Sequence, residues 1–114
     1  MTAMAANVSD GDIADIAAYF AGLECEGTLN AVDQAAAARK AGASVCTDCH
    51  GANGISSDRA WPNLAGQSKD YLADALKAYA SGERPNVVMS ALAKGVSDAD
   101  AEKLAAYYAG SSCK

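Results

Sequence analysis

Apolar residues recur at helical spacing near the start of the chain. Ser9 is a good N-cap, since its hydroxyl can accept a backbone N–H, and Asp12 occupies the reciprocal position of a capping box. Gly22 marks a plausible helix end. The pattern predicts an amphipathic helix over about 10–23. Its i, i+3, i+4, i+7 positions are Ile13, Ile16, Ala17 and Phe20.

The same pattern returns at the end of the chain. Residues 1–25 match residues 89–113 at a constant offset, so that Val8-Ser9-Asp10 falls on Val96-Ser97-Asp98 and Cys25 falls on Cys113. The agreement has no gap, and it indicates that half of a repeat unit precedes one complete unit. The later copy predicts a helix between Ser97 and Gly110 whose apolar face holds Ala101, Leu104, Ala105 and Tyr108.

Two further helices are predicted between these copies. One covers about 31–45 and is rich in alanine, and the other covers about 68–81 and stops at Gly82. The glycine-rich segment 51–66 and the segment 82–95 are predicted to be loops. No stretch alternates apolar and polar residues with the period of a strand, so we expect no sheet and an all-α fold.

Composition and charge narrow the class of protein. At 114 residues the chain is short for a self-sufficient core, and its 51% hydrophobic content includes much alanine and only 6% aromatic residues, so a large apolar cofactor would supply missing core. The net charge of −5 arises wholly within residues 1–30, and the remainder is neutral. Nucleic acid is therefore not an expected partner, and no strong electrostatic steering is expected. No apolar run approaches a membrane span.

Cys46-Thr47-Asp48-Cys49-His50 is the main chemical signal in the chain. It reads C-x-x-C-H, the attachment motif for a covalent haem c. Cys46 and Cys49 would each add to a haem vinyl group, and His50, the one histidine of the sequence, would ligate the iron. Competing interpretations are a zinc site completed by other cysteines and a dithiol redox site. The second of these would need a βαβ pattern that we do not predict.

Three downstream residues fit a haem site. Met89 is the one methionine after the motif, and its thioether is the candidate second axial ligand of a six-coordinate iron. The Pro62 carbonyl is the candidate acceptor for the second ring N–H of His50. Trp61 would either donate its indole N–H to a haem propionate or pack against the haem edge. Met89 alone would more often be a core filler. The alternative for Pro62 is a proline that only shapes a turn.

The two remaining cysteines are left open by the residues themselves. Export to an oxidising compartment would favour a disulfide between Cys25 and Cys113. The alternatives are two free thiols or bonds to a partner outside this sequence.

Several motifs in order resemble the class I c-type cytochromes, and most closely one C-terminal domain of the tandem dihaem cytochromes of the c-four type. They are Cys46 to Gly51, Pro62-Asn63-Leu64-Ala65-Gly66-Gln67, Tyr71-Leu72, Gly82-Glu83-Arg84, Met89, Val96 to Asp100 and Leu104 to Tyr107. The resemblance implies a class I cytochrome c fold, with three core helices around the haem plus an extra N-terminal helix. It also assigns haem attachment to Cys46 and Cys49, iron ligation to His50 and Met89, and the histidine contact to Pro62.

The resemblance divides the chain into two parts. Residues 1–30 resemble the end of a preceding cytochrome domain that starts at its ligand methionine, and residues 31–114 resemble a complete monohaem domain. Met1 therefore has no haem of its own within this chain. Gly42 departs from the pattern, because many single-haem relatives carry an aromatic residue there.

The leading hypothesis is an electron-transfer protein that carries one electron through a six-coordinate His/Met haem c, without catalytic residues or enzyme activity. The alternative is a haem subunit or domain of a larger oxidoreductase that relays electrons from a flavin or metal partner. In either case the partners are redox proteins, and the extra helix is a candidate surface for an upstream haem domain or a dimer. Covalent haem predicts a periplasmic protein, with numbering that begins after any export signal.

Overall fold

The structure is a computed structural model that describes residues 2–24 and 31–113. The described residues form helices and no strands, which confirms the predicted all-α class. In chain order the helices are α1 (Thr2–Ala5), α2 (Asp10–Gly22), α3 (Ala31–Lys40), α4 (Ala43–His50), α5 (Lys69–Ser81), α6 (Val87–Ala93) and α7 (Asp98–Gly110).

The repeat predicted from the sequence gives two helices of the same length with the same ends. α2 and α7 each span 13 residues and end at the predicted glycines. The Ser9 hydroxyl accepts the Asp12 N–H at 3.2 Å, and the Ser97 hydroxyl accepts the Asp100 N–H at 3.2 Å. The caps confirm that the local sequence sets where both helices begin.

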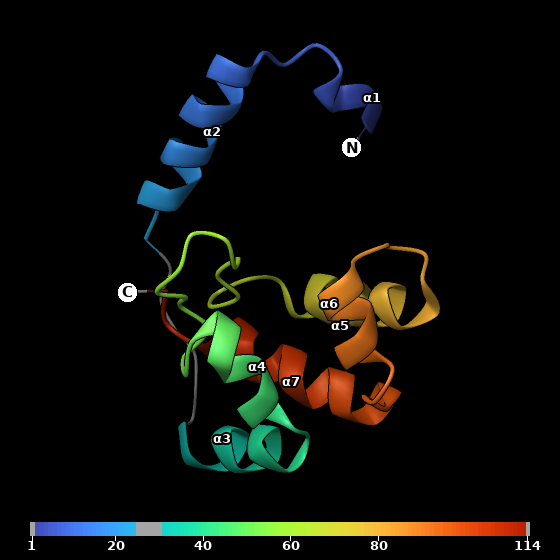
Figure 1. The fold of residues 1–114 in the computed structure, drawn as a ribbon. Coiled ribbons are helices and arrows are strands. Elements are labelled where there is room, and N and C mark those ends of the chain that lie inside the picture. The colour runs from blue at the N-terminus through green and yellow to red at the C-terminus, as the bar shows by residue number, and fades with distance from the viewer. Residues whose placement is uncertain (1, 25–30, 114) are drawn as a thin grey trace.

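The core of the domain surrounds α7. This helix packs against α3 and α5, and α5 packs in turn against α6. Its four predicted apolar positions are all buried, together with alanines of α3 and with Leu72 and Ala73 of α5. Figure 1 shows α3 to α7 gathered in one group, with α2 standing apart from it. No residue of α2 is buried.

The helix expected over 31–45 is broken in two. α3 ends at Lys40, and α4 begins at Ala43 after Gly42 takes a φ of 91°. A side chain would strain this left-handed conformation, so glycine suits the break. The break places the whole C-x-x-C-H motif on α4.

The loop expected over 82–95 contains a short helix that the sequence reading missed. α6 spans Val87–Ala93, and the Asn86 side chain caps it by accepting the Met89 N–H at 2.9 Å. The predicted loop 51–66 and the helix starting after Ser68 agree with the structure. Met89 therefore sits on a capped helical turn rather than on a loop.

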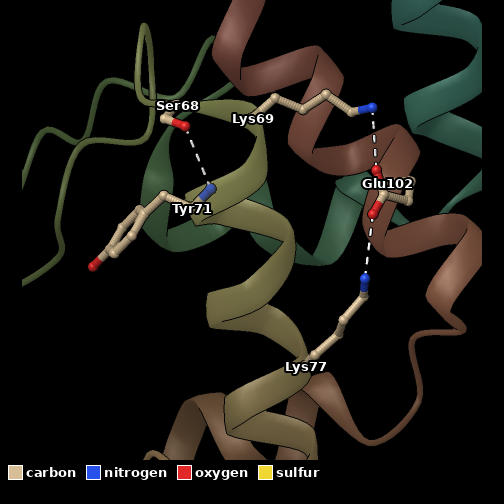
Figure 2. Close-up of polar contacts among 5 residues, drawn as sticks. All are labelled: Ser68, Lys69, Tyr71, Lys77 and Glu102. Carbon is tan, nitrogen blue, oxygen red and sulfur yellow. Dashed lines mark hydrogen bonds and ion pairs between the residues drawn. The ribbon is translucent and has the colours of Figure 1, made fainter.

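Two lysines of α5 hold a carboxylate of α7. Glu102 pairs with Lys69 at 3.1 Å and with Lys77 at 3.2 Å, as Figure 2 shows beside the Ser68 cap of α5. The lysines lie about two helical turns apart, so Glu102 links two points of α5 to α7. No helix within the described ranges is long and apolar enough to cross a membrane.

Candidate functional site: a haem-attachment cavity

A cavity of about 330 Å³ opens between α4 and α6. This volume lies within the range of small-molecule and cofactor pockets, roughly 300–1,000 Å³. Apolar residues make up most of its wall, and no charged side chain lines it. The lining residues are Ala41, Gly42, Val45, Cys46, Cys49, His50, Trp61, Leu76, Val88, Met89, Ala91, Leu92, Ala93, Gly95 and Val96.

Cys46 and Cys49 present two thiols to this cavity from one face of α4. Residues three apart on a helix are neighbours on its surface, which is why the C-x-x-C spacing directs both sulfurs to the same side. Both thiols are free and partly buried. Burial raises the pKa of Cys46, whose sulfur packs near the ring of Tyr108. The pair can therefore form two thioether bonds to one cofactor.

His50 follows directly and is held in one orientation. It is buried, with 6% of its surface exposed, at the C-terminal end of α4. Its Nδ1 lies 2.8 Å from the Pro62 carbonyl oxygen. A carbonyl oxygen only accepts hydrogen bonds, so Nδ1 carries the proton and Nε2 keeps its lone pair for a metal. The predicted contact between His50 and Pro62 is thus present.

The loop that carries Pro62 folds back on a glycine. The Gly54 carbonyl accepts the N–H groups of Leu64 at 2.8 Å and Ala65 at 3.0 Å. Gly54 has a φ of 78°, and a Cβ there would meet Tyr108 Cδ1 and Ala65 N at 2.8 Å. Only glycine permits this close approach of the loop to α7. Gly66 extends the attachment, since its N–H donates to the Tyr108 carbonyl at 3.0 Å.

Some of the other residues predicted from the sequence line the cavity, and others lie outside the residues that the structure describes. Met89 on α6 and Trp61 in the loop both line the cavity with Cys46, Cys49 and His50. The indole hydrogen bond from Trp61 to a propionate stays a prediction. Cys113 is disulfide-bonded, whereas Cys25 lies outside the described residues, so their mutual pairing also stays a prediction. Met1 lies outside the described residues as well.

Sequence reasoning missed much of the cavity wall. Val88, Leu92 and Val96 come from α6 and the turn after it, where we expected an irregular loop. The apolar run Val87-Val88-Met89 after the capping residue Asn86 could have indicated this helix. Gly42 also lines the cavity, so the break between α3 and α4 opens space beside Cys46.

The residues of the cavity fit haem c better than the competing zinc or dithiol sites. Two thiols, an imidazole nitrogen and a thioether border one apolar space, which is the donor set of a covalent His/Met haem. A structural zinc site needs four ligands. Within residues 2–24 and 31–113, no three His, Cys, Asp or Glu side chains lie close enough to share a metal ion.

Comparison with known proteins agrees with this assignment. Residues 33–107 match the family model described as cytochrome c oxidase, cbb3-type, subunit III. The chain is 42% identical over 79 residues to cytochrome c-554(548) of Halomonas halodenitrificans, covering 67% of this chain and 93% of that protein. It is 48% identical over 67 residues to the thiosulfate dehydrogenase electron acceptor of Thiomonas intermedia, covering 58% of this chain and 31% of that protein.

The structural comparison extends the likeness to nearly the whole chain. Reduced cytochrome c4 from Pseudomonas stutzeri superimposes with a TM-score of 0.82 at 34% identity, over 97% of this chain and 65% of that one. The class I cytochrome fold expected from the sequence is confirmed, and so is covalent haem c through Cys46 and Cys49. The chain belongs to the family of haem proteins described as cytochrome c oxidase, cbb3-type, subunit III.

Proposed function

We propose that this chain is a one-electron carrier whose haem iron is ligated by His50 and Met89. The observation that supports the proposal is the meeting of Cys46, Cys49, His50 and Met89 around one apolar cavity. Haem c supplies a reversible one-electron iron couple when it is bound. Neighbouring residues determine how that couple behaves, and each has a separate role.

His50 would bind the iron through Nε2. The hydrogen bond to Pro62 leaves that nitrogen unprotonated and prevents the ring from rotating. His50 is also buried at the end of α4, which keeps water away from the imidazole. A ring held in this way needs little rearrangement when the iron changes oxidation state, which favours rapid electron transfer.

Met89 would supply a thioether ligand to the iron. Its backbone N–H is held by the Asn86 cap, so the start of α6 fixes where the side chain leaves the backbone. A thioether ligand would raise the reduction potential, and an iron held by both His50 and Met89 would have no free position for oxygen or substrate. This arrangement suits electron transfer rather than chemistry on a bound ligand.

The partner is proposed to be another redox protein that meets an uncharged surface. Val45, Val88 and Leu92 line the cavity and are each more than 40% exposed, and the cavity wall includes no charged side chain. Trp61 stands at the same rim with 36% of its surface exposed. Association would then depend little on salt. We propose that the compartment is the periplasm, because covalent haem attachment to a bacterial protein implies its export.

Carbon monoxide binding tests the Met89 assignment. The reduced haem protein should not bind carbon monoxide at neutral pH, whereas Met89→Ala should bind it readily because the sixth position is open. Met4→Ala is the matched control, since Met4 is 74% exposed on α1. Carbon monoxide binding by the unaltered protein at neutral pH, equal to that of Met89→Ala, would contradict the ligation.

A second candidate function is electron relay within a larger redox protein, and α2 is the feature that favours it. Ile13, Ile16 and Phe20 are 47% to 65% exposed, although the same positions of α7 are buried. An upstream cytochrome domain with its own α3- and α5-like helices would cover this face. Counting haems against polypeptide mass in the protein purified from its own cells separates the two functions, because relay requires at least two haems per complex.

A further inference from the structure

We propose that Ser56 and Asn63 are positioning residues that hold the Pro62 carbonyl on His50 and thereby lower the reduction potential of the haem. The proposal rests on the proposed ligation of iron by His50. It concerns a hydrogen-bonded bridge that runs beside the His50–Pro62 contact and touches neither the haem-binding sulfurs nor the iron ligands.

The bridge joins the residue before His50 to the residue after Pro62. The Ser56 hydroxyl donates to the Cys49 carbonyl at 2.8 Å, and the Ser56 N–H donates to Asn63 Oδ1 at 2.8 Å. The imidazole bond itself also measures 2.8 Å. Cys49–Ser56–Asn63 and His50–Pro62 are therefore two parallel links between the end of α4 and the same point of the loop.

The backbone of Pro62 makes few hydrogen bonds that could hold its carbonyl in place, so the support must come from neighbouring residues. Proline has no N–H, so it cannot donate a hydrogen bond to hold its place. On one side of Pro62 the Trp61 N–H donates to the Asp58 carbonyl at 3.1 Å, within the same loop, and on the other side Leu64 and Ala65 bond to Gly54. Asn63 lies between them and Pro62, and its side chain makes the nearest link back to α4. Ser56 is the middle of that link and donates both of its hydrogen bonds, to Asn63 Oδ1 and to the Cys49 carbonyl.

The hydroxyl proton of Ser56 has two acceptors within reach. The Cys49 carbonyl lies at 2.8 Å and the Asp58 carbonyl at 2.9 Å, while the Asp58 N–H donates to the same hydroxyl at 3.1 Å. The Asp58 contacts shape a local turn. The Cys49 contact is the one that crosses to α4, so it is the contact that fixes the loop relative to the haem site.

The expected direction follows from the basicity of the imidazole. A firm Nδ1–H···O bond makes Nε2 a stronger electron donor, which favours ferric iron and lowers the potential. Without the bridge the Pro62 carbonyl can move away, so the bond weakens and ferrous iron is favoured. Loss of either Ser56 or Asn63 should therefore raise the reduction potential.

The experiment compares bridge variants of the full chain with haem attached. Asn63→Ala and Ser56→Ala should each raise the ratio of reduced to oxidised haem at a fixed applied potential, by about threefold for partial loss of one hydrogen bond. The double variant should add little, since both changes cut one bridge. When both are reduced, each bridge variant should exchange its His50 Nδ1–H with solvent faster than the unaltered protein does.

Two controls separate positioning from general loosening of the loop. Ser57→Ala and Asn53→Ala alter the same loop at side chains for which no hydrogen bond occurs among the described residues, so both should keep the native potential. Asn63→Asp retains an acceptor and should keep slow Nδ1–H exchange. If Asn63→Ala does not fold, Ser56→Ala still breaks the bridge, because it removes the contact with the Cys49 carbonyl.

The proposal fails if the bridge variants lower the unfolding midpoint but leave both the potential and the exchange rate at native values. Failure of the proposed ligation looks different. In that case the unaltered protein would lack the low-spin spectrum of a histidine-ligated haem, and the present proposal would fall with it.

Discussion

α2 and α7 are two copies of one helix that meet opposite surroundings. They share length, cap and glycine end, and they differ in what lies against their apolar faces. Leu104 of α7 is 1% exposed between α3 and α5, whereas Ile16, its equivalent in α2, is 47% exposed. Tyr108 is 3% exposed and its equivalent Phe20 is 65% exposed. The copy that buries no residue thus carries apolar side chains of similar size to those that α7 buries.

The local sequence determines where each helix begins and ends, whereas the elements packed against a helix determine which of its side chains are buried. A capping serine and helical spacing are enough to define both helices, because these signals act within a few residues. Burial depends on elements elsewhere in the chain. α7 has α3 and α5 beside it, and α2 retains the apolar face of a core helix without them. Substitutions at four positions of the α7 copy, two of them paired with the equivalent position of α2, test the comparison.

The largest difference is expected at the paired core positions Leu104 and Ile16. Leu104→Ala should lower the free energy of unfolding by about 2–5 kcal/mol, since it removes a fully buried side chain from the α3–α7 contact. Ile16→Ala should change it by less than about 0.5 kcal/mol, as for an exposed surface site. Urea unfolding of the haem protein, followed by circular dichroism, measures both.

The Ile16 result also tests whether an upstream domain covers α2. If such a domain is present in the purified complex, Ile16→Ala should become as costly as Leu104→Ala there, while remaining neutral in this chain alone. Equal and large effects in this chain alone would show that α2 folds back onto its own domain, contrary to the exposed face seen here.

Most of the haem site was readable from the sequence for a physical reason. Cys46, Cys49 and His50 lie within one and a half turns of a helix, so their mutual placement is local. Pro62 was a longer inference, but its carbonyl does meet His50. Such motifs need little knowledge of the tertiary structure, because the chemistry of attachment dictates the spacing.

The parts that sequence reasoning missed are the ones that depend on distant contacts. The break at Gly42 appears only once α3 and α4 must pack at an angle beside α7, and the alanine-rich pattern continues across it. α6 is seven residues long, too short for periodicity to reveal. The Ser56–Asn63 bridge joins residues without any sequence signal, since serine and asparagine are ordinary loop residues.

The paired N-caps give the next largest difference. Ser97→Ala should lower the free energy of unfolding by about 1 kcal/mol, because the Asp100 N–H loses its acceptor in a helix that is part of the core. Ser9→Ala removes the same bond from α2 and should leave the haem-monitored unfolding midpoint unchanged. Only far-ultraviolet helicity should fall slightly. An equal drop in midpoint for both variants would mean that α2 and α7 unfold as one unit.

Tyr108→Phe replaces the α7 residue by the one that α2 already carries. The Tyr108 hydroxyl is buried, and the one polar neighbour found for it among the described residues is the weakly interacting Cys46 sulfur. The free energy of unfolding of Tyr108→Phe should therefore stay level or rise by up to about 1 kcal/mol at neutral pH. Burial raises the pKa of Tyr108 above the ordinary value near 10. The unfolded chain therefore loses this proton first, and the native protein should lose stability as pH rises above about 10. Tyr108→Phe should lack that alkaline loss, whereas a parallel loss in both proteins would assign it elsewhere.

The smallest effect is expected at Glu102, where α2 carries Ala14 instead. Hydrogen bonds from Lys69 and then Lys77 hold the pKa of Glu102 below its usual range. A carboxyl shifted in this direction stabilises the fold above its ordinary pKa, and the contribution disappears as pH falls through the lowered value. Glu102 is exposed, so solvent screens both ion pairs. Glu102→Gln should therefore lower the thermal midpoint only slightly at neutral pH and low salt.

Glu83→Gln is the control, because Glu83 makes no ion pair among the described residues, and it should leave the thermal midpoint unchanged. The difference between the two variants should vanish in molar salt and in acid, because the pairs act through charge. A difference that survives both conditions would mean that Glu102 joins α5 to α7 by packing of its side chain.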